Sequence, residues 1–375
     1  MRRFLRNAWL LTVKELRSLA ADPILMFFIV YAFTFAIYAV TNGAKTDVSN
    51  AAIAIADEDH SELSRRIAGA FLPPFFREAM MVTASEAMRG LDEDKYVFLV
   101  EIPPDFEKDV LAGHRPEIQL SADATAMSLA GVGAGYIENI ILQEVTNFLS
   151  RGRAASPAPV NLVVHRLFNP NSDSTWFTSV MELVNNISML AIILTGAALI
   201  REREHGTIEH LLVMPVTPAG IMLAKMLANG FVIMVAAALS MSVVIHLLLN
   251  VPIAGSMLLF ISGMVLYLVA VTGLGIMLAT FASSMPQFTL LCMPVLIVLQ
   301  LLSGSTTPMD NMPVWLQVAM QFAPSPHFVA FSQAVLYRGA GIDVVWREML
   351  SMAFVGAAYF AASLFRFRNA IMRFR

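Results

Sequence analysis

The chain has few of the residues on which many catalysts and metal proteins depend. It has 375 residues but a single cysteine, Cys292, so an intrachain disulfide and a cysteine-based zinc or redox motif are excluded. The phosphate-loop pattern G-x-x-x-x-G-K-[ST] does not occur, nor do G-x-S-x-G and H-E-x-x-H. We therefore expect no catalytic, cofactor-binding or metal-binding residue in this chain.

Charge is also scarce, and its distribution is uneven. Only 14% of the residues are charged, whereas 57% are hydrophobic, above the roughly 45–50% that is usual in soluble domains. The composition therefore predicts a membrane protein. The formal net charge of -3 says little about partners, because residues of opposite sign are concentrated in different segments.

Six apolar stretches approach or exceed the length needed for a membrane-spanning helix, which is about 20 residues. The predicted spans are 24–40, 183–200, 226–249, 257–281, 288–302 and 349–365, of which the fifth is the shortest. They contain no Asp, Glu, Lys or Arg, which argues against an ion-coupled transporter. The lone His246 near the end of the third span is interpreted as a structural histidine rather than a proton relay.

Basic residues next to the spans predict the orientation of the chain, because short loops rich in Lys and Arg stay in the cytoplasm. Residues 1–23 and the tail 366–375 are both rich in arginine. Both termini are therefore expected to be cytoplasmic, which requires an even number of spans. The first span is interpreted as a retained anchor, because no small-residue cleavage site follows it.

Residues 41–181, between the first two spans, are acidic and have a different pattern, which predicts an extracytoplasmic α/β domain. Strands are expected at 51–57, 96–103 and 117–123, and helices at 61–71, 104–113 and 135–150. The acidic run 56–62 is a candidate cation site, although helix capping is the favoured interpretation. Gly131, Gly133 and Gly135 are interpreted as a hinge into the last helix, because they do not match the dinucleotide-binding spacing.

The second span is followed by an unusual concentration of charge, in the segment 201–220. Arg201 to Glu204 cannot remain in hydrocarbon and are expected to end the span at the cytoplasmic surface. Gly206 then breaks the helix, and a short second helix is expected before Pro215. Ile208, Leu211 and Leu212 form one apolar stripe on that helix, which favours docking into a groove of a partner over a solvated loop.

The sequence "REREHGTIEHLLVMPVTP" at 201–218 resembles the cytoplasmic coupling segment of the permease subunits of ABC-2 type transporters. Two further segments extend the resemblance. "TVKELRSLAADP" at 12–23 is similar to the family's amphipathic interface helix, and "NPNSDSTWF" at 169–177 lies where the family's external loop returns to the membrane. The resemblance is strongest to bacterial inner-membrane permeases of the drug-exporter type.

The resemblance implies a multi-pass protein of the bacterial inner membrane, driven by a separate ATPase that carries the ATP and Mg²⁺. It also implies a second permease copy, identical or related, and a periplasmic adaptor of the membrane fusion type as a further partner, whereas nucleic acid is not expected. The residues that the resemblance assigns to contact with the ATPase are Lys14, Glu15, Arg17, Arg201, Glu202, Arg203, Glu204, Gly206, Thr207, Glu209, Leu211 and Leu212.

A path for an apolar or amphipathic substrate would lie between two permease copies, along the second and fifth spans. Asn185 and Asn186 are its candidate lining residues, although asparagine in a span is as often an interhelical hydrogen-bonding residue. The external segment 303–348 resembles the re-entrant helices of the family. An alternative function is a membrane scaffold for envelope assembly that an ABC ATPase drives mechanically, and a secondary transporter ranks third.

Overall fold

The computed structural model describes residues 2–43, 51–73, 75–93, 95–122, 127–150, 173–206, 217–307, 309 and 312–372. The chain divides into two compact units. One comprises Met1–Ala44 with Leu167–Arg375 and is called the membrane unit; the other, Lys45–Arg166, is called the inserted unit.

The membrane unit is helical throughout its described elements. In chain order these are α1 (Arg2–Ala20), α2 (Pro23–Tyr31), the π-helical segment η1 (Ala32–Ala36), α3 (Ile37–Gly43), α8 (Ser174–Glu204), α10 (Pro218–Ser240), the π-helical segment η2 (Met241–Leu248), α11 (Met257–Phe281), α12 (Met285–Leu301), α13 (Val314–Met320), α14 (Pro324–Leu336) and α15 (Ile342–Met372). Three helices begin seven to nine residues before their predicted spans, α8 at Ser174 rather than 183, α10 at Pro218 rather than 226 and α15 at Ile342 rather than 349. The apolar run marks only the part of a helix that lies in hydrocarbon, so residues 174–181 and 342–348 belong to helices and not to the loops assigned to them.

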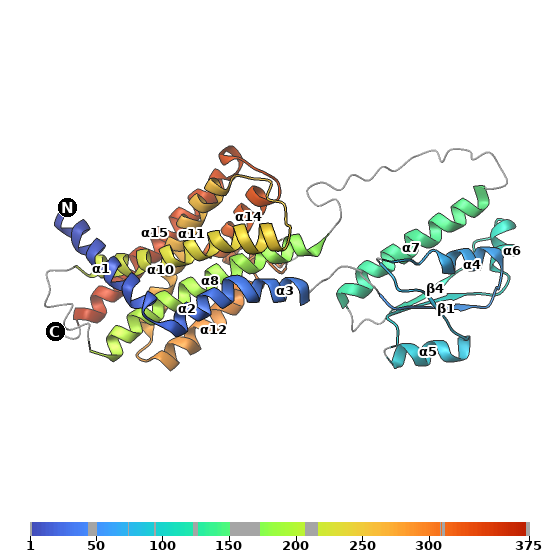
Figure 1. Ribbon diagram of the computed structural model, residues 1–375, viewed down its shortest axis with the longest axis horizontal. Coiled ribbons are helices and arrows are strands. Elements are labelled where there is room, and N and C mark those ends of the chain that lie inside the picture. Colours follow the sequence, from blue (N-terminus) through green and yellow to red (C-terminus); the bar gives the residue numbers. More distant parts are fainter. Residues whose placement is uncertain are drawn as a thin grey trace. The chain divides into compact units, whose positions relative to one another are not determined.

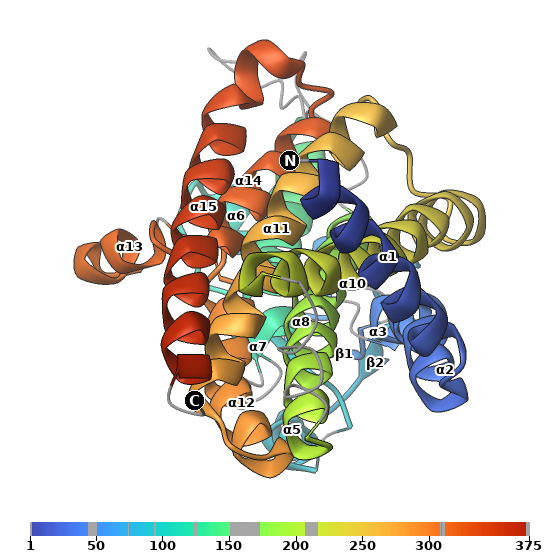
Figure 2. The same ribbon diagram turned by 90° about the vertical axis from the view of Figure 1, so that its left-hand side faces the viewer.

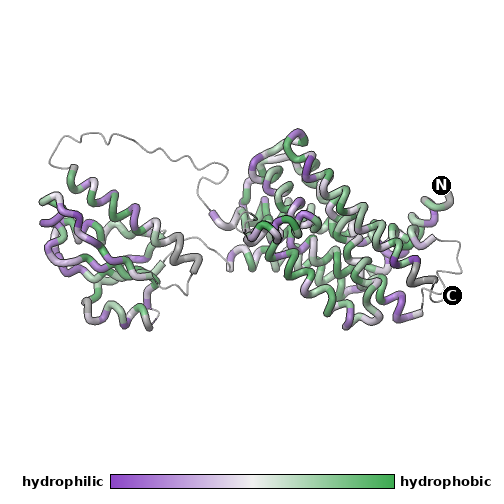
Figure 3. The backbone as a smooth tube through the Cα atoms, turned by 180° about the vertical axis from the view of Figure 1, so that it is seen from behind, coloured by the Kyte–Doolittle hydropathy of each residue, from purple (hydrophilic) through white to green (hydrophobic). Residues whose placement is uncertain are grey.

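Five helices of the described residues are long and apolar enough to cross a membrane. They are Pro23–Gly43, Ser174–Glu204, Pro218–Leu248, Met257–Phe281 and Ile342–Arg368. The predicted span at 288–302 corresponds to α12, whose 17 residues extend about 25 Å, short of the roughly 30 Å hydrocarbon core. The sixth crossing therefore stays a prediction. Hydrophobic residues predominate along the helices of this unit (Figure 3).

The beginning of α1, the end of α8 and the end of α15 lie at the same end of the membrane unit (Figure 1). Contacts between side chains agree with this arrangement. Lys14 of α1 contacts Glu202 at the end of α8, and Arg366 of α15 stacks on Phe281 at the end of α11. The first helix begins and the last helix ends at the same end of the membrane unit, which is consistent with an even number of crossings.

Helix ends in this unit are set by local sequence. Asp22 accepts hydrogen bonds from the backbone N–H groups of Ile24 and Leu25, and Pro23 occupies the first turn of α2. Thr217 caps α10 in the same way, ahead of Pro218. Capping side chains accept from the free N–H groups of the first turn, and proline has no N–H there to leave unpaired.

The centre of the membrane unit is α8, which packs against α11, α10, α3 and α12 (Figure 2). Gly275 of α11 faces α8 so closely that an added Cβ would lie 2.6 Å from the Ile192 carbonyl oxygen. Small residues of this kind let two membrane helices approach, because packing and not hydrophobicity drives their association in lipid. Cys292 of α12 is buried among these helices.

The inserted unit contains a four-stranded sheet in the order β2-β1-β3-β4. Its strands are β1 (Ile53–Asp57), β2 (Met80–Met81), β3 (Phe98–Ile102) and β4 (Gln119–Ala122), and its helices are α4 (Glu62–Gly69), α5 (Ala84–Asp92), α6 (Phe106–Leu111) and α7 (Met127–Ser150). Strand β1 pairs in parallel with β2 and β3, whereas β4 is antiparallel to β3. The three predicted strands and three predicted helices overlap observed elements, but β2 and α5 were not predicted.

Both faces of this sheet are covered, by α4 and α7 on one side and by α5 on the other (Figure 1). The predicted glycine hinge is wrong, since Gly131 to Gly135 lie inside the continuous helix α7. Gly133 is instead a packing position, because an added Cβ would clash with the ring of Phe98 on β3. In the acidic run 56–62, Asp57 accepts from the backbone N–H groups of Asp59 and His60 in the turn before α4. The helix itself is capped by Ser61, which accepts from the Ser64 backbone N–H.

Candidate coupling site at the end of α8

The four charged residues that end α8 contact three different parts of the membrane unit. Arg201 pairs with Asp22 at 3.5 Å, and Glu202 pairs with Lys14 at 3.3 Å and with Lys225 at 2.9 Å. Arg203 donates to the Ala282 carbonyl oxygen at 2.7 Å. Glu204 accepts from the Met285 backbone N–H at 2.8 Å. Lys14 belongs to α1 and Asp22 caps α2, whereas Lys225 belongs to α10. The two backbone groups lie where α11 ends, at Ala282, and where α12 begins, at Met285. The last turn of α8 is therefore a junction.

The most enclosed member of this junction is Lys225, whose side chain is only 2% exposed. Its ammonium lies 2.9 Å from Glu202 Oε2 and 3.4 Å from Glu15 Oε2, and it donates to the Ala198 carbonyl oxygen at 3.2 Å. A buried ammonium is costly unless such partners compensate its lost hydration. Lys225 thus connects α10 to both α8 and α1.

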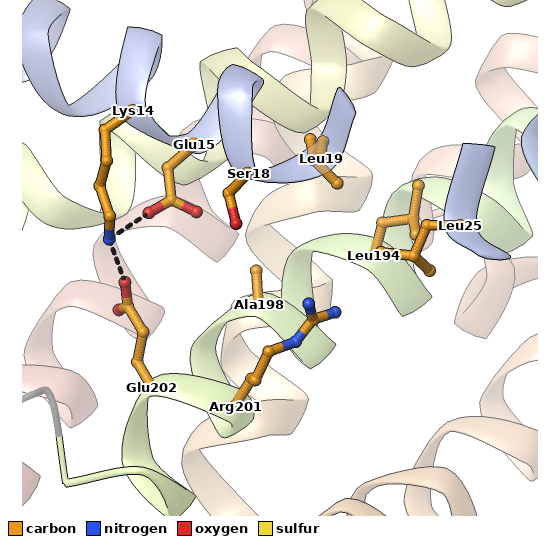
Figure 4. A pocket seen from close by; sticks show the side chains of 9 residues that line it. All are labelled: Lys14, Glu15, Ser18, Leu19, Leu25, Leu194, Ala198, Arg201 and Glu202. Atoms are coloured by element: carbon orange, nitrogen blue, oxygen red, sulfur yellow. Dashed lines mark hydrogen bonds and ion pairs between the residues drawn. The ribbon is translucent and has the colours of Figure 1, made fainter. Parts of the chain in front are cut away.

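Lys14 lies between the same two carboxylates, Glu15 and Glu202, from the solvent side (Figure 4). Burial alone would raise the pKa of Glu15, but the attraction of Lys225 and then of Lys14, with their hydrogen bonds, outweighs it and holds the pKa below its ordinary value. Likewise, burial favours a lower pKa for Lys14, yet Glu15 and Glu202 together raise it. Glu15 and Lys14 are therefore both ionised at neutral pH.

A small cavity of about 90 Å³ lies beside this network, between α1, α2 and α8 (Figure 4). Ser18 and Leu19 of α1 line it, opposite Ala198 and Arg201 of α8. The cavity is only a few times larger than one water molecule, about 30 Å³. The packing between these three helices is therefore incomplete beside the charged network.

The end of α8 has the geometry that the charged segment predicts. His205 forms the C-cap, and Gly206 follows with φ of 64°, a left-handed conformation that glycine adopts without steric cost. The N–H groups of both residues bond back to carbonyl oxygens of the last turn. Of the other predicted ATPase contacts, Arg17 is exposed on α1, whereas Thr207, Glu209, Leu211 and Leu212 lie outside the described residues.

The two candidate path residues have different surroundings. Asn186 is buried, and its amide donates to the Ala32 carbonyl oxygen of η1 at 2.9 Å, so it joins α8 to the first span. Asn185 is partly exposed, and its side-chain oxygen accepts from Ser305, which follows α12, at 3.3 Å. The structure therefore does not place the two asparagines in one site.

The segment predicted to resemble re-entrant helices contains α13 and α14. Trp315 of α13 is 71% exposed. On α14, His327 lies 2.8 Å from the Glu348 carboxylate of α15, and Tyr337, next to its C-terminal end, donates to backbone carbonyl oxygens of Trp176 and Phe177 at the start of α8. These contacts connect α14 to both α15 and α8.

Sequence reasoning did not assign Lys225 or Asp22 to the junction. Glu182 on α8 and Lys225 on α10 lie directly before the spans predicted at 183–200 and 226–249, which themselves contain no such charge. The signal was an isolated lysine in the apolar run "IMLAKMLAN" and an Asp-Pro pair at 22–23. In the described residues, no group of His, Cys, Asp and Glu side chains is arranged to hold a metal ion.

Comparisons with known proteins agree with the architecture. The profile of the ABC-2 family transporter protein family matches residues 23–365. The chain is 49% identical over 369 residues to the inner membrane transport permease YhhJ of Escherichia coli (strain K12), covering 98% of this chain and 99% of the relative.

Two further relatives carry the description of probable multidrug ABC transporter permeases in Escherichia coli (strain K12). YbhR is 30% identical over 372 residues, with 97% and 99% of the two chains covered, and YbhS is 25% identical over 342 residues, with 89% of each covered. The match to the family spans nearly the whole chain and includes both units. The chain therefore belongs to the ABC-2 transporter family, as a multi-pass permease of the inner membrane.

Proposed function

We propose that this chain is the membrane-spanning subunit of an ATP-driven exporter, and that a separate ABC ATPase binds the segment following Gly206. The observation that carries the proposal is the junction at the end of α8. A movement of the ATPase just beyond Gly206 would be transmitted to the last turn of α8. The charged residues of this turn are bonded to α1, to the start of α2, to α10 and to the residues that join α11 and α12. Most of the helical bundle can then respond together.

The energy would come from the partner, which carries ATP and Mg²⁺. Glu209 and the apolar pair Leu211 and Leu212 would enter a cleft of the ATPase, with Thr207 starting the short helix. Arg17, exposed on α1, is available to the same partner. Lys14 and Glu15 are bonded within the chain, so their contribution would be to hold α1 in position beside the coupling segment.

The substrate would be drug-like or amphipathic, and its path would lie between two permease copies beside α8 and α12. Support comes from Asn185, a partly exposed polar residue on α8 that contacts Ser305 after α12. The name of the relative YbhR, a probable multidrug permease at 30% identity, points the same way. A periplasmic adaptor is a further proposed partner, and the inserted unit is the part of this chain available to receive it.

The test is co-purification of the tagged permease with its ATPase. Glu209→Ala and Leu212→Asp are expected to reduce both the amount of ATPase recovered and its activity, because each changes a side chain that the sequence predicts to contact the ATPase. Matched controls are Glu117→Ala and Leu111→Asp, at exposed positions of the inserted unit. Unchanged recovery and activity in both coupling-segment variants would contradict the proposal.

A further inference from the structure

One face of α8 is less enclosed than the rest of the helix. We call this face the stripe, and its residues are Thr178, Glu182, Asn185, Met189 and Ile193. All the other residues of α8 from 179 to 192 are buried. Their spacing of three or four residues places them on a single side of the helix. The stripe is polar in its N-terminal half and apolar in its C-terminal half.

Contacts on either side of the stripe define where it opens. On one side Asn186 bonds to Ala32 of η1, in the first span. On the other side Asn185 bonds to Ser305, which follows α12. Successive residues of a helix turn by about 100°, so Glu182 points between these two directions. The stripe therefore opens between the first span and the end of α12, the side on which the proposed path lies.

Glu182 lies near the outer limit of the hydrocarbon. The rise along α8 from Arg201, at the cytoplasmic junction, to Glu182 is about 28 Å, close to the roughly 30 Å thickness of a bilayer core. Among the described residues, no hydrogen bond or ion pair involves the Glu182 carboxylate. A carboxylate at this depth without a cation is costly, and such residues are usually kept for binding or transport.

We propose that this stripe binds an organic cation with an apolar body. Glu182 attracts the positive charge, Asn185 contributes a polar contact one turn deeper, and Met189 and Ile193 contact the apolar part. The inference rests on the proposed function, since it places the stripe on the export path, and it narrows the substrate to cationic amphiphiles.

The test uses two probes of nearly the same shape and opposite charge, tetraphenylphosphonium and tetraphenylborate. Binding of each is measured by equilibrium dialysis to the purified permease–ATPase complex in lipid nanodiscs, after subtraction of binding to empty nanodiscs. The wild type is expected to bind the cation and Glu182→Gln to bind it about five- to tenfold more weakly. Tetraphenylborate binding is expected to stay the same or to strengthen.

Glu182→Asp retains the charge and is expected to restore most of the cation binding. Glu138→Gln, an exposed position on α7, makes the same change of charge in the inserted unit and is expected to have no effect. The inference is overturned if the wild type does not bind the cation, or if Glu182→Gln binds it as tightly as the wild type.

ATP-dependent transport of the cation in proteoliposomes separates this inference from the proposed function. If cation binding depends on Glu182 but no ATP-dependent transport is measured, the cation site on α8 is supported and the proposed export function is contradicted. ATP-dependent transport that Glu182→Gln leaves unchanged would support the exporter and reject this site.

Discussion

At the scale of single residues, Lys225 joins three helices at the cytoplasmic end of the membrane unit, because it pairs with Glu15 of α1 and Glu202 of α8. An ammonium with a 2% exposed side chain exchanges most of its hydration for two carboxylates and a backbone carbonyl oxygen. Such an arrangement adds little net stability compared with apolar packing, but the loss of one member leaves the others uncompensated. The lysine is therefore more important for the attachment of α1 than its single charge suggests.

Lys225→Met is expected to lower the free energy of unfolding by about 3–5 kcal/mol, because Glu15 and Glu202 would lose their most buried partner. Lys14→Met is the matched control: Lys14 is largely exposed, and its loss is expected to cost about 1 kcal/mol or less. Thermal unfolding of the two purified variants in the same detergent measures the difference. Equal midpoints would show that Lys225 does not hold the junction.

At the scale of helices, α14 is attached to α15 through His327. Its Nε2 donates to the Gln321 carbonyl oxygen at 3.0 Å, and its Nδ1 faces the Glu348 carboxylate at 2.8 Å. The hydrogen bond with Glu348 raises the pKa of His327 against the opposing effect of burial. Both ring nitrogens face acceptors, so the protonated imidazole fits this position best.

The stabilisation due to this contact is expected to depend on pH. Because the pKa of His327 is raised on folding, the contribution is complete below the ordinary histidine value of about 6.5 and is lost as the pH rises through the raised value. Melting temperatures of the wild type and of Glu348→Gln should thus differ most near pH 6 and converge toward pH 9. Parallel curves over this range would contradict the assignment.

The accuracy of each helix prediction depended on whether an apolar run, a capping residue or tertiary packing determines the helix and its contacts. Apolar runs indicated the positions of α2, α8, α10, α11 and α15, since the bilayer imposes their length, but the polar first turns of α8 and α15 carry no hydropathy signal. Capping residues such as Gly206 gave the end of α8 correctly. The partners of the charged turn could not be predicted, because Lys14 and Lys225 are brought to Glu202 only by tertiary packing.

The same limit applies in the inserted unit. Strands β1 and β3 have strong apolar runs, whereas β2 consists of Met80 and Met81 alone and is held by pairing with β1. Likewise, Gly133 has the sequence appearance of a flexible position, yet it lies within α7 against Phe98. A glycine selected for close packing cannot be distinguished from a hinge by spacing alone.

At the scale of the whole molecule, the chain is a helical membrane unit with a separate α/β unit inserted between α3 and α8. The inserted unit has its own core, in which Ile53, Phe98 and Ile137 are fully buried. A unit of this size with apolar layers on both faces of its sheet meets the usual requirements for independent folding.

We therefore expect residues 45–166, produced without the membrane unit, to unfold in one cooperative transition. Phe98→Ala is expected to destabilise this fragment by about 3–5 kcal/mol, because it removes a ring from the centre of the core. Met88→Ala, at an exposed position, should change stability by about 0.5 kcal/mol or less. Chemical denaturation followed by circular dichroism measures both, and the absence of a cooperative transition would show that the unit depends on the rest of the chain.

The burial of Cys292 also has a practical consequence. This thiol, the only one in the sequence, is enclosed between helices, so thiol-directed reagents have poor access to it. Cysteines that are introduced at exposed positions can therefore be labelled selectively without first replacing Cys292. A spin label at Arg17→Cys on α1, paired with one at Glu138→Cys on α7, would report whether the membrane unit and the inserted unit move relative to each other when the proposed partner hydrolyses ATP.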